Sequence, residues 1–332
     1  MSAPPMDRSR AWGKRGLTTR PAPGRSRDKG YAARGTVGLS ARGGMGETNR
    51  VRGPLLLLAA LGLFALLDTN SKLLSGHYPP QQVVGIRYAT MLTLLLLARL
   101  ARPGLGGDLG TRHPWLHLLR AAGMLGSAFG FFLALRGLAL AEGYLVYFTA
   151  PFFTLALAAL FLREPVPASA WGWCALGFGG VLMSLLPGLT GGAPVASYLW
   201  ALMGTVCYSI VMTINRWLRH EAGMARLILW TSAPGLLVLL PFLMESWVPP
   251  GTRDLAALMA NGVFSGVASL CLAGAFRHAS ASRLAPLEFS ALAYAVVFDL
   301  AIWGVVPGPW AMAGAAVVML SGVMSQRSAR AA

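Results

Sequence analysis

The chain has 332 residues, of which 55% are hydrophobic and 12% are charged, and its formal net charge at pH 7 is +16. This composition is far more apolar than that of an ordinary globular domain and predicts a polytopic helical membrane protein. The positive charge alone would suit a nucleic-acid-binding protein. No basic-aromatic platform or recognition module accompanies it, so nucleic acid is excluded as an expected partner.

Residues 1–53 contain 12 of the 28 basic residues and three of the 12 acidic ones. They show no apolar periodicity, so we expect a disordered basic N-terminal tail over residues 1–53. Three interpretations of this tail compete: an Arg-rich transit peptide, a basic cytoplasmic tail, or a start codon assigned too far upstream, with Met45 as the true start. The first 45 residues contain no apolar segment, so no cleavable secretory signal is predicted.

Ten apolar segments follow, joined by brief separators rich in turn residues. The segment Tyr144–Leu162, for example, contains no charged residue, and its length fits a hydrocarbon core of about 30 Å. We therefore expect an all-α integral membrane protein. The predicted spans are Pro54–Ser75, Gln82–Leu100, Pro114–Leu135, Gly143–Leu162, Ala168–Leu186, Ser197–Trp217, Arg226–Met244, Leu255–Arg277, Ala281–Trp303 and Pro309–Met324.

The segments Ala141–Met183 and Ser282–Val323 share a spacing of glycines and prolines. When Gly172 is aligned with Gly314, the next matching glycine and both hinge prolines also coincide, while Glu164 falls on Val306. An internal repeat in a membrane chain is typical of a transporter. We predict a first repeat over residues 54–187, a second over residues 196–325 and a short basic cytoplasmic tail over residues 326–332.

The distribution of arginine predicts the orientation. With a cytoplasmic N-terminus, 11 arginines lie at predicted inside loops and only Arg136 and Arg253 lie at outside loops. Both termini are therefore expected in the cytoplasm. Because each half has an odd number of spans, the second half must be inverted relative to the first. The predicted fold is ten transmembrane helices arranged as two inverted five-helix repeats.

Small residues gather in three of the predicted spans, where close backbone approach would hold helices together in lipid. We expect these positions to be packing sites rather than ligand sites. They are Gly123, Gly126, Ser127 and Gly130 in the third span, Gly172, Gly177, Gly179 and Gly180 in the fifth, and Gly262, Gly266, Ser269 and Gly274 in the eighth.

Charged residues inside spans are costly, so each is a candidate functional residue. Asp68 and Lys72 are spaced i, i+4 in the first span. They form either a locally neutralised pair or, in the functional interpretation, part of a cavity in which Asp68 binds substrate or a proton. Arg87 in the second span is expected to pair with Asp68 or Asp299.

Arg120 and Glu288 lie at similar predicted depths in the third and ninth spans. A buried arginine without a carboxylate would be unfavourable, so we predict an Arg120–Glu288 ion pair that either locks two helices or is broken by substrate. Glu288 and Asp299 are eleven residues apart, nearly three helical turns, and share one face. We favour a structural or solvated role for Asp299, close to the outer end.

Aromatic residues at helical spacing include Tyr147 in the fourth span and Tyr208 in the sixth. Such stripes usually serve packing; the functional alternative is that both tyrosines contact substrate. Pro151 removes a helical hydrogen bond at mid-membrane and suits a hinge or a cavity wall. Glu164 lies in the cytoplasmic hinge after the fourth span and is not placed in the site.

Several of these residues resemble the EamA type of the drug/metabolite transporter superfamily. The resemblance rests on the ten-span plan, on Pro151, Arg163-Glu164-Pro165, Gly172 and Gly180, and on Ala285-Pro-Leu-Glu288. Residues 67–74, His117–Arg120 and Ala285–Glu288 look most like the branch containing S-adenosylmethionine uptake permeases, with riboflavin importers and amino-acid exporters as neighbours. The resemblance covers residues 54–325 and implies a central cavity, a bacterial inner membrane and no ATP. Val306 departs from the family's glutamate.

We expect a secondary carrier that moves a small polar or zwitterionic metabolite. Arg120 would bind a carboxylate, Asp68 or Glu288 an amine or proton, and Tyr147 and Tyr208 planar groups. The partners are the substrate and the lipid bilayer, with proton coupling or exchange left open. The three cysteines lack metal spacing, and His113 and His117 have no acidic partner nearby in sequence. No cofactor, metal or catalytic residue is predicted. An intramembrane enzyme and a passive channel or scaffold are the alternatives.

Overall fold

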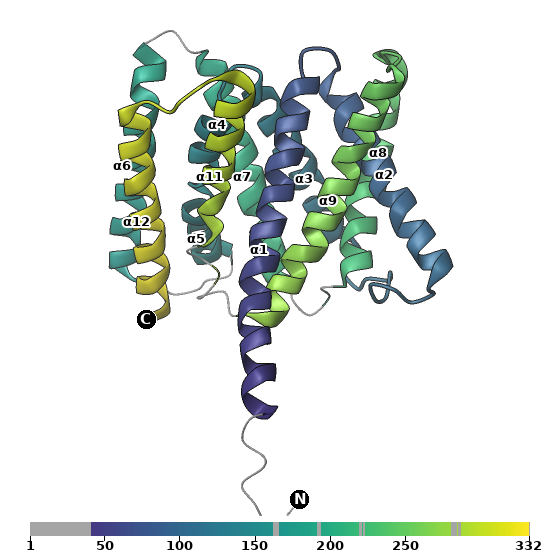
Figure 1. Ribbon diagram of the computed structural model, residues 1–332, viewed down its shortest axis with the longest axis horizontal. Helices are drawn as coiled ribbons and strands as arrows, with labels where there is room; N and C mark the ends of the chain where they lie inside the picture. Colours follow the sequence, from purple (N-terminus) through teal and green to yellow (C-terminus); the bar gives the residue numbers. More distant parts are fainter. Residues whose placement is uncertain are drawn as a thin grey trace, which may run out of the picture. The chain divides into compact units, whose positions relative to one another are not determined.

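The computed structural model describes residues 41–161, 166–190, 194–218, 221, 223–279, 284 and 287–331, and this part of the chain is helical throughout its regular structure (Figure 1). Residues 44–332 form one unit. Its helices are α1 (Ala41–Leu74), α2 (Pro80–Ala101), α3 (Pro114–Leu135), α4 (Leu140–Tyr147), α5 (Ala150–Phe161), α6 (Ala168–Thr190), α7 (Val195–Trp217), α8 (Met224–Glu245), α9 (Thr252–His278), α11 (Ser290–Phe298), the π-helical turn η2 (Asp299–Trp303) and α12 (Pro309–Ala331).

Length and apolar composition allow seven of the described helical segments to cross a membrane. Two shorter apolar segments, Ser290–Trp303 and Pro309–Ser325, come near the end of the chain. The predicted class of multi-pass, all-α membrane protein is thus confirmed. The seven segments are Val51–Leu74, Pro80–Ala101, Pro114–Leu135, Leu140–Phe161, Val195–Trp217, Met224–Glu245 and Thr252–His278.

Helical structure extends beyond the predicted spans at both ends of the unit. The sequence predicts a disordered tail through residue 53, whereas α1 begins at Ala41 and contains Pro54. At the other end, α12 continues through Ala331 and includes most of the predicted terminal tail. Helix propagation explains both differences, because each residue added to an existing helix gains a hydrogen bond without a new nucleation cost. Residues 1–40 lie outside the described part, as does Glu164.

The predicted fourth span is two helices rather than one. Helix α4 ends at Tyr147 and α5 begins at Ala150, with Thr149 between them donating its amide to Val146 O instead of continuing the α-helical pattern. Pro151 accounts for the break, because it has no N–H and its ring clashes with the carbonyl one turn earlier. The predicted ninth span is also irregular, since α11 gives way to a π-helical turn at Asp299.

Glycines bring α3 and α7 into close contact. A β-carbon at Gly130 would lie 2.7 Å from Gly204 Cα, and one at Gly123 would lie 2.8 Å from Val211 Cγ2. Residue numbers rise along α3 as they fall along α7, so the two helices are antiparallel. The predicted role of these α3 glycines in packing is confirmed, as close approach allows van der Waals contact without large side chains.

The glycines of α6 and α9 divide into packed and open positions. A β-carbon at Gly180 would lie 3.0 Å from Gly314 O, and Gly177 and Gly262 are similarly enclosed. Gly172, Gly179 and Gly266 have no neighbouring atom within 4 Å of a built β-carbon. The packing prediction is therefore right for part of each set and wrong for those three positions. Helices α6 and α12 lie side by side through the enclosed glycines (Figure 1).

A hydrophobic cluster surrounds α4 and joins it to three other helices. Leu140 and Leu145 of α4 pack with Phe131 of α3, Leu292 of α11 and Ala315 of α12. Helix α4 carries two of the predicted site tyrosines, so this cluster fixes where their rings lie. The polar residues considered next are therefore held by a rigid apolar frame.

Replacing Gly130 with alanine should destabilise the protein, because the added methyl group meets backbone atoms that cannot move aside. Overpacking of this kind costs about 1–3 kcal/mol. Gly266→Ala is the matched control: its position is open and mid-helix, where alanine is favoured over glycine by about 1 kcal/mol. Thermal unfolding in detergent should show a lowered midpoint for the first variant only. Equal midpoints would contradict the packing described for α3 and α7.

Candidate functional site

Asp68 of α1 meets Tyr144 of α4 inside the bundle. The Tyr144 hydroxyl donates to Asp68 Oδ2 at 2.6 Å. Arg87 of α2 is close enough to interact with the Asp68 carboxylate electrostatically, and its Nε has no hydrogen-bond partner among the described residues. This arrangement agrees with the predicted pairing of Arg87 with Asp68 rather than with Asp299. Asp68 therefore keeps one carboxylate oxygen for further binding.

Tyr147 and Tyr208 come together from α4 and α7. Their ring centroids are 6.0 Å apart, and Tyr147 packs edge-on against Phe131 of α3 at 4.6 Å. The Tyr147 hydroxyl lies 2.9 Å from Ser127 Oγ and donates to Ser127 O at 3.0 Å. Phe131 also stacks on Tyr144, with centroids 5.6 Å apart. An aromatic surface with hydroxyl groups thus continues from Asp68 toward Tyr208.

The break between α4 and α5 adds unpaired backbone groups to this surface. Ser209 of α7 donates its hydroxyl to Ala150 O at 3.1 Å, and Thr149 donates its hydroxyl to Val146 O at 2.6 Å. These bonds satisfy carbonyls that the helix leaves free, as hydrocarbon cannot do so. Pro151 therefore lies at a real interruption of the helix, as its predicted role as a hinge requires.

Asp299 is fully buried and binds the start of α4. Its two carboxylate oxygens accept hydrogen bonds from the amides of Leu140 and Ala141, at 3.1 and 2.8 Å. Oδ1 also lies 3.5 Å from Lys72 Nζ, which is 4.3 Å from the centre of the Trp303 ring. A carboxylate at a helix N-terminus is stabilised by the helix dipole and by free N–H groups. This geometry agrees with the structural role favoured for Asp299.

The predicted local pairing of Asp68 with Lys72 is wrong. Although the two residues are spaced i, i+4, Lys72 forms its ion pair with Asp299, while Asp68 accepts from Tyr144. The reason is that Asp299 is buried and already at a helix terminus, so it holds a full charge beside Lys72. Sequence spacing within α1 could not show a partner that lies 227 positions later.

The predicted Arg120–Glu288 ion pair does not occur among the described residues. Arg120 of α3 is buried, and its Nη2 donates instead to Leu227 O at 2.7 Å and to Thr231 Oγ1 at 2.5 Å, both on α8. A buried guanidinium can be held by neutral acceptors when they are well placed, so matching depths did not require a carboxylate. Arg120 Nε has no hydrogen-bond partner in the described part.

Glu288 is half-buried and precedes α11. It is close enough to Tyr208 to interact electrostatically, and no ion pair of Glu288 is found within the described ranges. Its carboxylate is therefore available to a mobile ligand. Together with Asp68 and Arg120, it gives the interior two acids and one base from three different helices.

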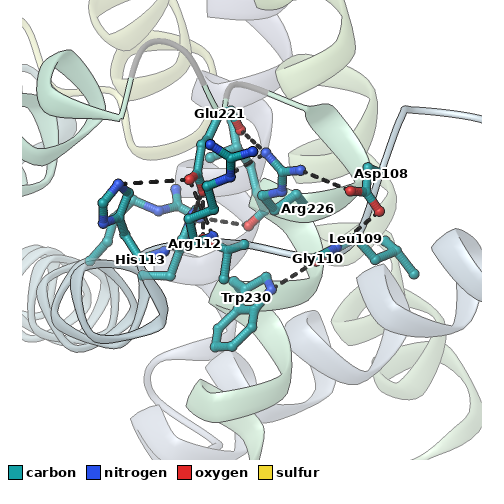
Figure 2. A network of polar contacts seen from close by, with 12 residues as sticks. Asp108, Leu109, Gly110, Arg112, His113, Glu221, Arg226 and Trp230 are labelled. Atoms are coloured by element: carbon teal, nitrogen blue, oxygen red, sulfur yellow. Dashed lines mark hydrogen bonds and ion pairs between the residues drawn. The ribbon is translucent and has the colours of Figure 1, made fainter.

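Sequence reasoning missed a second polar site, which we call the Glu221 cluster and which comprises Asp108, Thr111, His113, His117, Glu221 and Arg226 (Figure 2). Glu221 Oε2 accepts from the Thr111 hydroxyl at 2.5 Å and lies 3.5 Å from His117 Nε2. His113 Nε2 is 3.9 Å from Glu221 Oε1, which also accepts from the Arg112 amide at 3.2 Å. The expectation that these histidines lack an acidic partner is wrong.

Arg226 extends the cluster to the loop between α2 and α3. Its Nη2 lies 3.5 Å from Asp108 Oδ2, and its Nη1 donates to Glu221 O at 2.9 Å. Trp230 donates its indole N–H to Leu109 O at 3.0 Å, and the Ala225 amide donates to Gly106 O at 3.1 Å. One sequence signal pointed here: Glu221 and Asp108 are acids within otherwise arginine-rich loops.

No group of three or more His, Cys, Asp or Glu side chains suited to a metal ion occurs in the part of the chain that the structure describes. What the interior offers is hydrogen bonding, charge and aromatic surface. Such a set can bind a polar molecule with charged and planar parts; it does not contain a nucleophile activated by a neighbouring base.

The model of the EamA-like transporter family matches residues 51–186 and residues 195–325. A crystal structure of a protein shares the fold, with a TM-score of 0.59 at 20% identity, over 84% of this chain and 98% of that chain. Two separate family matches within one chain agree with the internal similarity seen in the sequence.

Curated relatives are transporters by name. The S-adenosylmethionine uptake transporter of Rickettsia conorii is 25% identical over 215 residues, or 64% of this chain and 71% of that protein. The pseudopaline exporter CntI of Pseudomonas aeruginosa is 24% identical over 286 residues, with 83% and 96% covered. The riboflavin transporter of Vibrio cholerae is 26% identical over 284 residues, with 82% and 91% covered.

Asp299→Asn should destabilise the fold, because an amide cannot accept from both α4 amides and leaves Lys72 without a counter-ion. Removing one member of a buried pair costs about 3–5 kcal/mol. Adding Lys72→Met should recover part of the loss by removing the unpaired cation. Thermal unfolding of the single and double variants measures both effects. A single variant as stable as the parent would contradict the assigned role.

The Glu221 cluster should remain closed well into the acidic range. The Thr111 hydroxyl, followed by the Arg112 amide and His117, holds the pKa of Glu221 below its ordinary value. A lowered pKa means that the bound carboxylate stabilises the cluster above the ordinary glutamate pKa of about 4.3, and that this stabilisation is lost as pH falls through the lowered pKa.

Hydrogen exchange of the loop before α3 tests this pH dependence. Glu221→Gln should exchange faster than the parent at pH 7, and the ratio of the two rates should stay constant until the pH falls below about 4. Taking the ratio at each pH cancels the intrinsic pH dependence of exchange. A ratio that collapses between pH 5 and 7 would mean that His113 and His117, not Glu221, control the loop.

Proposed function

This chain belongs to the EamA-like transporter family, and from that membership we propose that it is a secondary carrier for a small polar or zwitterionic metabolite. The observation that supports the cargo class is the placement of Asp68, Arg120 and Glu288 inside spans together with an aromatic surface. Ionised groups inside a bilayer are costly and occur where a substrate or ion passes. We propose alternating access in the inner membrane, with both termini cytoplasmic.

Ten spans in two inverted halves would explain the helix contacts. Counting α4 with α5 and α11 with the π-helical turn gives five spans before residue 191 and five after it. The contacts of α2 with α9 and of α3 with α8 exchange when the halves are exchanged. The contacts of α2 with α8, α4 with α11 and α6 with α12 each map onto themselves. Such a pattern is expected of a pseudo-twofold axis in the membrane plane.

Each polar group in the interior has a role in cargo binding under this proposal. Arg120 binds a carboxylate, since it has donors left after bonding to α8. Asp68 or Glu288 binds an ammonium group or a proton, and the rings of Tyr147 and Tyr208 bind a planar or cationic part. S-adenosylmethionine has an amino-acid end, a cationic sulfur and a purine, so it is the first compound to test.

Uptake into proteoliposomes tests the carrier function. Radiolabelled S-adenosylmethionine, riboflavin and a set of amino acids would be offered with and without a proton gradient. We expect saturable uptake of at least one compound, exchange with unlabelled cargo from the other side, and no dependence on ATP. Uptake that never saturates would favour a passive channel, and no uptake or counterflow of any compound would contradict the proposal.

Neutralising Glu288 should abolish transport while leaving membrane insertion intact. Glu288→Gln keeps the size of the side chain but removes the charge that the cargo or a proton requires, so uptake should fall at least about 100-fold. Glu245→Gln is the matched control, because Glu245 is exposed at the end of α8. Normal uptake by the Glu288 variant would remove Glu288 from the site.

A further inference from the structure

Every strong contact of the Glu221 cluster crosses between the two halves of the chain. Thr111 and His117 belong to the first family match, and Glu221 and Arg226 belong to the second. The bonds Thr111 to Glu221 and Arg226 to Asp108 therefore connect one half to the other. If the halves separate at this end, all of these contacts must break together.

The cluster lies next to the buried guanidinium of Arg120. His117 is one helical turn before Arg120 on α3, and its ring is 5.7 Å from that of Trp230 on α8. Arg226 directly precedes Leu227, whose carbonyl accepts from Arg120. The first turn of α8 thus bonds to the cluster on one side and to Arg120 on the other.

The opposite end of the unit has contacts in the equivalent place. Tyr78, between α1 and α2, donates its hydroxyl to Asp254 Oδ2 at 2.6 Å. Gln82 donates to Val248 O at 2.7 Å and accepts from the Val248 amide at 3.0 Å. Exchanging the halves converts this meeting of connections into the meeting at Glu221. Two equivalent contacts at opposite ends suit a carrier that opens one end at a time.

The two ends differ in chemistry. The outer contacts use a hydroxyl and an amide as donors, whereas the Glu221 cluster sets a guanidinium and two imidazoles against carboxylates. Charged contacts near water are weakened when a competing ion or a conformational change separates them. An anionic group that draws Arg120 away from Leu227 and Thr231 would release the same turn of α8 that positions Arg226.

We infer that Glu221 is a positioning residue for transport and the centre of a gate between the two halves, at the end of the bundle predicted to face the cytoplasm. The gate is closed in this structure and opens when cargo with an anionic group occupies Arg120. The inference rests on the proposed carrier function, and its test uses a readout that needs no cargo.

Thiol labelling of an interior position measures whether the gate is open. Met124 lies on the face of α3 that also presents Arg120, Ser127 and Phe131, by helical spacing. A Met124→Cys variant would be made after replacing the three native cysteines with alanine. A membrane-impermeant maleimide would then be applied separately to inside-out and right-side-out vesicles. Labelling from each side reports access to the interior from that side.

Glu221→Gln in this background should raise the labelling rate at least threefold from one side only, the inside-out preparation. Asp108→Asn is the control, because its side chain is 80% exposed and removes one outer contact of the same cluster; its effect should be smaller. An increase from both sides would mean general loosening of the bundle and would overturn the inference, as would no change from either side.

A reversible cross-link tests the same gate in the other direction. Thr111→Cys with Glu221→Cys, joined by a short bifunctional thiol reagent before maleimide is added, should prevent labelling at position 124 from the inside, and reduction should restore it. Labelling unaffected by the cross-link would overturn the inference. If labelling responds as expected but no cargo is taken up by the parent, the gate stands and the proposed function fails.

Discussion

Hydrocarbon offers no hydrogen-bond partner to a broken helix, and this constraint decides how the interior of the molecule is built. The break after Tyr147 and the start of α4 both place free backbone groups within the bundle. Asp299 accepts from the amides of Leu140 and Ala141, and Ser209 donates to Ala150 O. Because both partners come from the second half of the chain, the interrupted helices of the first half are stable only in the assembled bundle.

The ionised groups of the interior therefore divide into two kinds. Asp299 and Lys72 have their charges matched by the protein itself, through a helix terminus, an ion pair and the Trp303 ring. Asp68, Arg120 and Glu288 keep binding capacity that no described neighbour uses in full. This division separates what holds the fold together from what is offered to cargo, and it gives the family membership a physical meaning in this particular chain.

Periodicity and small residues predicted most of the fold, because apolar length and close helix approach are local properties. The α3 glycines, the interruption at Pro151 and the meeting of Tyr147 with Tyr208 were all accessible in this way. Ion pairs were not, because a partner distant in sequence leaves no spacing to read. Lys72 chose Asp299 over its i+4 neighbour Asp68, Arg120 chose two neutral acceptors on α8, and the histidines of α3 found Glu221 about a hundred residues away.

The wide turn at residues 299–303 has a consequence for how this segment can change over time. A π-helical turn accommodates one more residue than an α-helical turn of the same rise. Losing a single residue there would wind the segment into ordinary helix and rotate everything beyond it by about 100° relative to α11. Trp303 would then leave Lys72, and the left-handed Gly304 that ends the turn at φ 66° would no longer be in register. Length in this segment is thus more constrained than residue identity, and insertions or deletions should be rarer there than substitutions.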